Sequence, residues 1–355
     1  MDWLLFLKKE NLFGIIISYM PKNFKALSTS IDKNGNYINE VVEKSINDLP
    51  KHNTLIKVEY SSLNYKDALS ATGVPGITKS YPHTPGIDAA GVIEKCSNNS
   101  YPKGTKVIIT GFDLGMNTAG GFGQYIRVPE DWIVKCPQNL STKEAMIIGT
   151  AGLTAGLSIN AITKKKVIKD SDIIISGASG GVGSIAIKVL SSLGANVSAI
   201  SGKEEATQFL KSLGASKIIS REDFLNSTRF PLDKALYDSA IDVVGGKILS
   251  SILAKVKYGG ITAICGNVAG PQFETSVFPF ILRNNSLVGI DSAEASIHEK
   301  KSFWENVSMQ WNIKEFDSFS KTVTLNNIVP EISKILQGKQ MGRVLVKLWP
   351  LPTYD

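Results

Sequence analysis

The chain has 355 residues, which is enough for two domains of ordinary size, and 43% of them are hydrophobic. These values are typical of a folded globular protein and exclude disordered and fibrous chains. The formal net charge is +7, but the basic residues are spread along the chain, with a single lysine triplet at residues 164–166. We therefore expect a solvated surface and no nucleic-acid partner.

Cysteine and histidine are scarce and scattered. The three cysteines form neither a disulfide framework nor a C-x-x-C pair, and the three histidines lack the spacing of a zinc site. We therefore expect no bound metal and a reducing compartment, the cytoplasm. No segment predicts a membrane-spanning helix, so we expect no membrane partner.

Residues 1–23 are interpreted as an N-terminal extension. Its two apolar runs, residues 3–7 and 12–20, are interrupted by the polar residues 8–11, and neither run is long enough to cross a bilayer. A secretory signal would begin with a basic segment, which is missing here. An organellar targeting role for the extension stays open.

Residues 24–144 predict the first part of an irregular β domain. Short strand-like runs are separated by Gly and Pro, and they fall at residues 54–60, 90–94, 106–110 and 124–128. Ser141 and Glu144 then have the spacing of a capping box, which predicts the start of a long helix.

A glycine-rich turn at residues 176–186 follows the apolar strand at residues 172–175 and opens a helix. Gly181, Gly183 and Ala186 have the G-x-G-x-x-A spacing, which gives a tight turn, close approach of a pyrophosphate and close packing of helix on strand. The free amides of the first helical turn would face the anion. The turn therefore predicts a dinucleotide site; the alternative is a turn that only packs helix against sheet.

The alternation of strands and helices continues downstream and predicts a doubly wound parallel sheet. Strands are expected at residues 195–200, 217–220, 239–244 and 260–265, with helices at residues 204–213 and 247–256. The fold class is therefore α/β, with a Rossmann domain at residues 145–285. Residues 286–355 would complete this sheet with a strand at 286–290, then return to the first domain and end in a strand at 343–348.

The end of the second strand indicates which dinucleotide binds. NAD-binding folds place an Asp or Glu about twenty residues after the glycines to accept the ribose hydroxyls. This chain has Ser201, Gly202 and Lys203 there instead. A hydroxyl and an ammonium suit a 2′-phosphate, because charge-assisted hydrogen bonds are the stronger ones. We therefore predict NADPH as the cofactor.

Several motifs together resemble the medium-chain dehydrogenase/reductase superfamily and, within it, the zinc-free quinone oxidoreductases of the acryloyl-CoA reductase (YhdH/YhfP-like) family. Besides the glycine turn, the matching segments are residues 61–68, 85–91, 146–152, 201–203, 279–284 and 289–292. The resemblance implies a GroES-like catalytic domain, a Rossmann domain and an NADPH site in the cleft between them. Zinc-dependent relatives carry Gly-His-Glu where this chain has Gly86, Ile87 and Asp88, so the resemblance also implies no metal.

The resemblance implies a set of site residues. Tyr65 would contact the cofactor near its nicotinamide and act as the catalytic orienting group. The remaining cofactor contacts would be the pyrophosphate turn (Ser179, Gly180, Gly181, Val182, Gly183), the 2′-phosphate clamp (Ser201, Gly202, Lys203) with Lys217 in support, and four residues that close over the cofactor (Asn267, Ile281, Ser292, Arg343). The alternatives are that Asn267 caps a strand, Ile281 is core, and Arg343 pairs with a surface carboxylate.

The functional expectation is an NADPH-dependent oxidoreductase that transfers hydride to the activated C=C bond of a short α,β-unsaturated acyl-CoA, as acryloyl-CoA reductases do. The alternative is a quinone or enone reductase that uses the same cleft, and a third hypothesis is an NADPH-binding protein without turnover. The glycine turn recognises the cofactor, so it does not separate these substrates. The edge strand at residues 286–290 predicts a homodimer.

Overall fold

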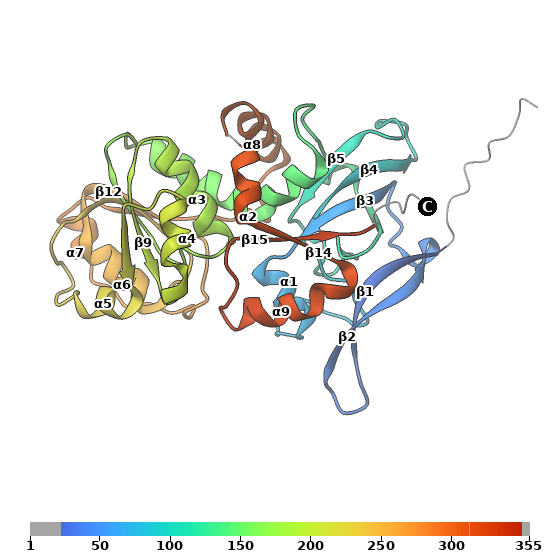
Figure 1. Ribbon diagram of the computed structural model, residues 1–355, viewed down its shortest axis with the longest axis horizontal. Helices are drawn as coiled ribbons and strands as arrows, with labels where there is room; N and C mark the ends of the chain where they lie inside the picture. Colours follow the sequence, from blue (N-terminus) through green and yellow to red (C-terminus); the bar gives the residue numbers. More distant parts are fainter. Residues whose placement is uncertain (1–22, 312, 350–355) are drawn as a thin grey trace, which may run out of the picture.

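The computed structural model describes residues 23–311 and 313–349, which form two lobes joined by a long helix (Figure 1). The predicted N-terminal extension falls almost wholly outside the described residues. The α/β fold class is confirmed: one lobe is built on an irregular, largely antiparallel sheet and the other on a parallel sheet. A two-stranded hairpin stands apart from both sheets.

The first lobe contains a seven-stranded sheet with the order β14-β15-β3-β4-β5-β7, in which β6 pairs with β3. Only β14 and β15 are parallel neighbours. The strands of this lobe, with the separate β1–β2 hairpin first, are β1 (Asn23–Ile31), β2 (Tyr37–Ser45), β3 (Thr54–Ser62), β4 (Asp88–Cys96), β5 (Lys106–Thr110), β6 (Tyr125–Val128), β7 (Val134–Lys135), β14 (Ser320–Thr324) and β15 (Arg343–Lys347).

The second lobe contains a six-stranded parallel sheet with the order β10-β9-β8-β11-β12-β13. Its strands are β8 (Asp172–Ile175), β9 (Asn196–Ser201), β10 (Lys217–Ser220), β11 (Tyr237–Asp242), β12 (Val256–Ile264) and β13 (Ser286–Gly289). Strand β9 pairs with one side of β8, and β11, which comes later in the chain, pairs with the other side of β8. This reversal of strand order is where open α/β sheets form a ligand crevice, at the carboxyl ends of the strands.

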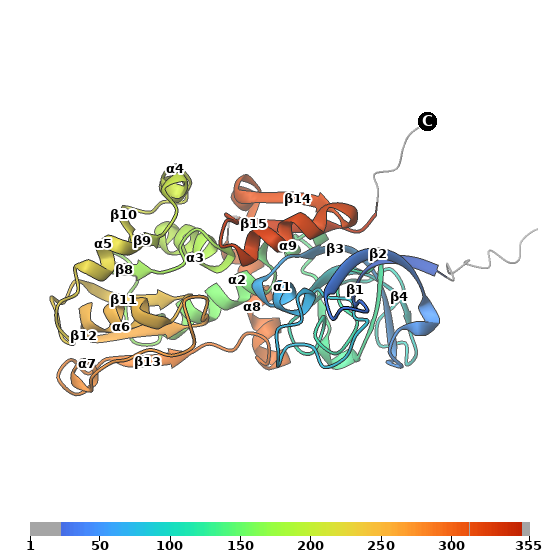
Figure 2. The ribbon, with the colours of Figure 1, turned by 90° about the horizontal axis from the view of Figure 1, so that it is seen from below.

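The helices connect these strands and cover the sheets (Figures 1 and 2). They are α1 (Tyr65–Ala71), α2 (Thr142–Thr163), α3 (Gly181–Ser192), α4 (Thr207–Ser212), α5 (Arg221–Asn226), α6 (Gly246–Lys255), α7 (Phe278–Ile281), α8 (Ile297–Gln310) and α9 (Ile328–Leu336). The sequence prediction contained α2, α3, α4 and α6 but none of α1, α5, α8 and α9.

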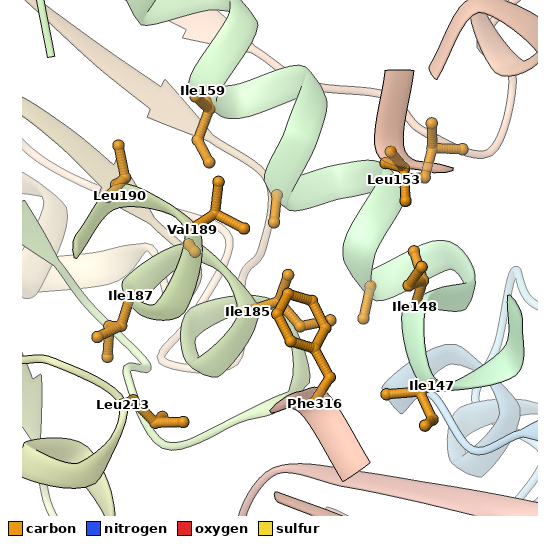
Figure 3. Packing of buried hydrophobic residues seen from close by; sticks show 14 of the residues in the cluster. Ile147, Ile148, Leu153, Ile159, Ile185, Ile187, Val189, Leu190, Leu213 and Phe316 are labelled. Carbon is orange, nitrogen blue, oxygen red and sulfur yellow. The ribbon is translucent and has the colours of Figure 1, made fainter. Parts of the chain in front are cut away.

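Helix α2 joins the lobes. It starts at the predicted capping box, in which the Ser141 hydroxyl accepts from the Glu144 amide. It packs on β3 and β4 of one lobe and on α3 and β12 of the other, and Figure 3 shows its side chain Ile159 beside Val189 and Leu190 of α3. Among the described residues it is the one helix long and apolar enough to cross a membrane, but 72% of its apolar window is buried in the protein. The domain boundary predicted between residues 144 and 145 therefore falls in the first turn of α2.

Candidate active site

A cleft of about 490 Å³ lies between the two lobes. Its walls include the carboxyl ends of β8, β9, β11 and β12, the first turn of α3 and the start of α1. A wider and more open hollow of about 650 Å³ beside Glu130 and Lys301 contains none of the residues of the glycine turn. The cleft at the switch point of the parallel sheet is therefore the candidate site.

The glycine turn forms the floor of this cleft. Ser179, Gly180, Gly181 and Val182 line it, and α3 begins at Gly181 with its first amides facing the open space. Gly183 lies just behind: a Cβ there would be 2.5 Å from the carbonyl oxygen of Gly177. Only glycine therefore lets the helix approach the turn this closely, and the resulting cradle of amides fits a pyrophosphate.

The end of β9 forms the next part of the cleft. Ser201, Gly202 and Lys203 line it, and the Lys203 ammonium donates to the Ser179 hydroxyl at 3.0 Å and to the Gln340 carbonyl at 2.5 Å. Burial lowers the pKa of Lys203 below its ordinary value. The ammonium thus lies over the cleft beside the glycine turn, at a position suited to a bound anion.

Arg221 supplies a second cation that the sequence prediction missed. It lines the cleft, and its guanidinium packs on Gly202 so closely that a Cβ on that glycine would lie 2.8 Å from Nη2. The reason is the register of the parallel pair: Ser220 lies opposite Ser201, so Arg221 follows β10 where Gly202 follows β9. A basic residue directly after the neighbouring strand was the available signal, but using it requires knowledge of that register.

Lys217, which was predicted to support the phosphate, lies outside the cleft. It is exposed at the amino end of β10, opposite Ser198, whereas the cleft is at the carboxyl end of that strand. Ile281 is also outside the cleft, on α7, with 68% of its surface exposed, so it is not a core residue either. Asn267 lines the cleft after β12, and its contact with a cofactor stays a prediction.

Tyr65 also lines the cleft, as the first residue of α1. It is half-buried, and the structure records no hydrogen bond from its hydroxyl to any other described residue. That hydroxyl is therefore available to a ligand, and the catalytic role of Tyr65 stays a prediction.

Ser292 and Thr154 form a hydroxyl pair in the same region, with their oxygens 2.6 Å apart. The Thr154 hydroxyl donates to the carbonyl of Thr150 at 2.7 Å, so the shared bond is donated by Ser292. The Ser292 oxygen then keeps its acceptor capacity, which suits an amide NH₂ group. The sequence prediction named Ser292 but missed Thr154, because only the fold brings the two together.

Arg343 begins β15 and is 1% exposed, so the alternative of a surface ion pair is wrong. Arg343 is among the residues that line the cleft, and its guanidinium lies beside the glycine turn: a Cβ on Gly181 would be 3.0 Å from Nη1. Its direct contact with the cofactor stays a prediction.

Asp67 is fully buried below the site. Its carboxyl group accepts from the amides of Asn64 and Ile87, each at 2.7 Å. Burial raises the pKa of Asp67 to about 7, and the nearby charge of Asp88 adds to this. In the folded protein the Asp67 carboxyl group therefore keeps its proton up to about pH 7, whereas in the unfolded chain it has lost this proton at a lower pH.

This raised pKa predicts a pH-dependent stability. The unfolded pKa is about 3.9, so between about pH 4 and pH 7 the folded state binds more protons than the unfolded state. The contribution of Asp67 to stability is full below this window and is lost as the pH rises through about 7. We expect the change in unfolding free energy between about pH 5 and pH 7.5, measured with urea, to be smaller in Asp67→Asn than in the wild type. An equal change in both proteins would contradict this assignment.

Comparison with known proteins identifies the family. Residues 50–138 match the alcohol dehydrogenase GroES-like domain and residues 181–308 match the zinc-binding dehydrogenase domain. YhfP of Bacillus subtilis, which carries the name of a quinone oxidoreductase, is 40% identical over 332 residues, which cover 93% of this chain and 100% of YhfP. The chain belongs to the medium-chain dehydrogenase/reductase superfamily, in the family of YhfP, YhdH and AcuI. The members of this family are oxidoreductases that act on small molecules. This chain is an oxidoreductase of the same kind.

Further members of the family support this assignment. The acrylyl-CoA reductase AcuI of Ruegeria pomeroyi is 35% identical over 325 residues, which cover 91% of this chain and 98% of AcuI. The YhdH oxidoreductase of Salmonella enterica in complex with NADP has a TM-score of 0.88 and 38% identity, and the match covers 92% of this chain and 100% of YhdH. YhfP with NAD bound has a TM-score of 0.88 and 40% identity, with coverage of 92% and 99%.

One of the two matching domain families is named for binding zinc, but the described residues provide no group of side chains for that metal. Across residues 23–311 and 313–349, no three His, Cys, Asp or Glu side chains gather closely enough to hold a metal ion. Gly86, Ile87 and Asp88 are the residues that the resemblance places where zinc-dependent relatives carry their motif, and the Asp88 carboxylate accepts hydrogen bonds from Ser62, Asn64 and Thr150.

Proposed function

We propose that this protein is an NADPH-dependent reductase of the activated C=C bond of short α,β-unsaturated acyl-CoA thioesters. The observation that supports NADPH is the pair of cations that line the cleft, Lys203 after β9 and Arg221 after β10, with Ser201 at the position where NAD-binding folds carry a carboxylate. The YhdH relative bound to NADP supports this choice. The AcuI relatives, which are named acrylyl-CoA reductases, support the substrate.

The residues of the cleft fit NADPH along its length. The amides at the start of α3 would hold the pyrophosphate, and Lys203 and Arg221 would hold the 2′-phosphate. The Ser292 oxygen, oriented by Thr154, would accept from the carboxamide of the nicotinamide. Tyr65 would lie beside the nicotinamide end.

When bound, the cofactor supplies a hydride, which goes to the β-carbon of the thioester while the C=C electron pair moves toward the thioester oxygen. The Tyr65 hydroxyl would donate a hydrogen bond to that oxygen as its negative charge develops. The apolar side chains of Leu63, Ile87 and Ile290 line this part of the cleft and restrict water around the reacting carbons. A proton delivered to the α-carbon completes the saturated thioester.

Quinone reduction is the second candidate, because YhfP carries the name of a quinone oxidoreductase. The decrease in NADPH absorbance should be followed with acryloyl-CoA, crotonyl-CoA and a small quinone in parallel. We expect the highest kcat/KM with acryloyl-CoA. Faster oxidation with the quinone would favour the second candidate, and binding of NADPH without oxidation by any acceptor would support a non-catalytic protein.

We also propose a homodimer that forms through β13. This strand is at the edge of the parallel sheet opposite β10, next to α7 (Figure 2), and the exposed fractions of nearby Val277 and Ile281 are 62% and 68%. An uncovered strand edge beside apolar side chains is typical of an interface. A cytoplasmic enzyme without membrane or nucleic-acid partners fits the free cysteines and the dispersed basic charge.

The dimer predicts a defined mutational effect. Val277→Asp combined with Ile281→Asp should convert the dimer to a monomer, because two charges would have to be desolvated in the interface. Light scattering after size-exclusion chromatography measures the mass. Met309→Asp on α8, where the side chain is 74% exposed, is the control and should remain dimeric. A monomeric wild type, or a double variant that stays dimeric, would contradict the proposed interface.

A further inference from the structure

Helix α2 is broken at Gly149, where φ is 50° and ψ is −156°. A break of this kind leaves amides and carbonyls without partners inside the helix. The Thr150 amide donates to the two carboxylate oxygens of Asp88 at 3.1 and 2.9 Å. On the other side, the Ile147 carbonyl accepts from Nε of Arg343 at 2.9 Å. Two charged residues from different strands therefore cap the two ends of the break.

Asp88 and Arg343 do not touch directly, since their closest charged atoms are 3.9 Å apart. Two side chains connect them. The Ser62 hydroxyl donates to Asp88 at 2.6 Å and accepts from Arg343 at 2.8 Å. The Asn64 amide likewise donates to Asp88 at 2.8 Å, while its oxygen accepts from Arg343 at 3.2 Å.

This arrangement requires a carboxylate at residue 88. Every hydrogen bond recorded for the side chain of Asp88 is one that it accepts, from Ser62, Asn64 and both the amide and the hydroxyl of Thr150. An asparagine would place an NH₂ group against one of these donors. Both Asp88 and Arg343 are almost fully buried, so neither charge is screened by water.

The Arg343 guanidinium also lies beside the start of α3. Nη1 is the atom that a Cβ on Gly181 would approach to 3.0 Å, and Gly181 is the first residue of α3. The same Nη1 donates to the Leu63 carbonyl and to the Asn64 side chain, so the protein itself holds the group in place. Its positive charge is therefore fixed next to the first turn of α3.

We propose that Asp88 is a positioning residue for the cofactor: through Ser62 and Asn64 it holds the charged guanidinium of Arg343 beside the start of α3, where the phosphates would bind. The inference rests on the proposed NADPH site and adds to it a residue that does not line the cleft. It follows that Asp88 affects affinity for the pyrophosphate half of the cofactor and not for the 2′-phosphate end.

The test measures binding without any acceptor substrate. The Kd of NADPH and the Kd of adenosine 2′-monophosphate, which lacks the pyrophosphate and nicotinamide, are determined by calorimetry for the wild type and Asp88→Asn. We expect the variant to weaken NADPH about tenfold or more and the monophosphate less than about threefold. Gln124→Leu removes buried hydrogen bonds in the same lobe, to Lys25 and Leu348, and is the matched control for a general loss of stability.

A double-mutant cycle tests whether Asp88 acts through Arg343. Asp88→Asn should weaken NADPH much less when Arg343 is already replaced by Gln. Equal weakening in both backgrounds, or equal weakening of NADPH and adenosine 2′-monophosphate, overturns the inference. If Asp88→Asn does not fold, Ser62→Ala removes one connection and should still weaken NADPH selectively; an unchanged ratio of the two Kd values then overturns it.

These outcomes are distinct from failure of the proposed function. A wild type that does not bind NADPH refutes the proposed cofactor and this inference with it. A wild type that binds NADPH but reduces no acyl-CoA refutes the proposed reaction. The binding test of Asp88 remains valid in that case, because it uses no acceptor substrate.

Discussion

Gly183→Ala is expected to weaken NADPH binding by at least about 100-fold, because the added methyl group forces α3 away from the glycine turn. The new Cβ would lie 2.5 Å from the carbonyl oxygen of Gly177 and 2.7 Å from the Cα of Ala178, and both are backbone atoms that no side-chain rotation can move. The amides at the start of α3 would then no longer converge on the pyrophosphate. Calorimetric titration with NADPH measures the loss directly.

Gly289→Ala is the control for this substitution. A Cβ at that glycine of β13 would have no atom within 4 Å, and we expect its affinity for NADPH to equal that of the wild type. The thermal unfolding of both variants should be recorded, so that a general loss of folding is recognised. NADPH affinity within about threefold of the wild type in a folded Gly183→Ala would show that close packing of α3 is not required for binding.

Lys203→Glu is expected to lower the preference for NADPH over NADH by about two orders of magnitude. The lysine ammonium lies at the cleft between Ser179 and Gln340, so a carboxylate there would repel the 2′-phosphate and also lose a charge-assisted hydrogen bond. NADH lacks that phosphate, and its KM should change by less than about threefold. Adding Arg221→Ala should reduce the preference further, because it removes the second cation beside Gly202.

Lys217→Glu is a matched control, since it makes the same charge change on the adjacent strand. Lys217 lies at the far end of β10 from the cleft, so this variant should keep the preference for NADPH. Steady-state kinetics with both cofactors tests the two variants together. If Lys217→Glu changed the preference as much as Lys203→Glu, the effect would come from overall charge and not from a phosphate site.

The parts of the site that lie in one continuous segment could be predicted from the sequence. The glycine turn combines its spacing, the strand before it and the helix after it within residues 172–192, and the structure places all of these as expected. The strand β10 was predicted at its observed limits for the same reason, as a short β-branched run between turn signals. Periodicity and turn chemistry are local properties, so one sequence is enough to recognise them.

The parts that depend on register or on distant packing could not be predicted. Arg221 is next to Gly202 only because β9 and β10 pair in one register. The same register places Lys217, which the family resemblance suggested as support for the phosphate, at the other end of β10. Thr154 and Ser292 are 138 positions apart, and Asp88 and Arg343 meet only around the break at Gly149. Neither pair has a pattern in the sequence that points to the other member.

The most direct test of the central claim follows the hydride itself. Acryloyl-CoA is incubated with the protein and with NADPH that carries deuterium at the transferred position of C4, and the product is analysed by mass spectrometry and NMR. We expect propanoyl-CoA with one deuterium at C3 and a solvent-derived proton at C2. Label at C2, or oxidation of NADPH without formation of propanoyl-CoA, would contradict hydride transfer to the activated double bond.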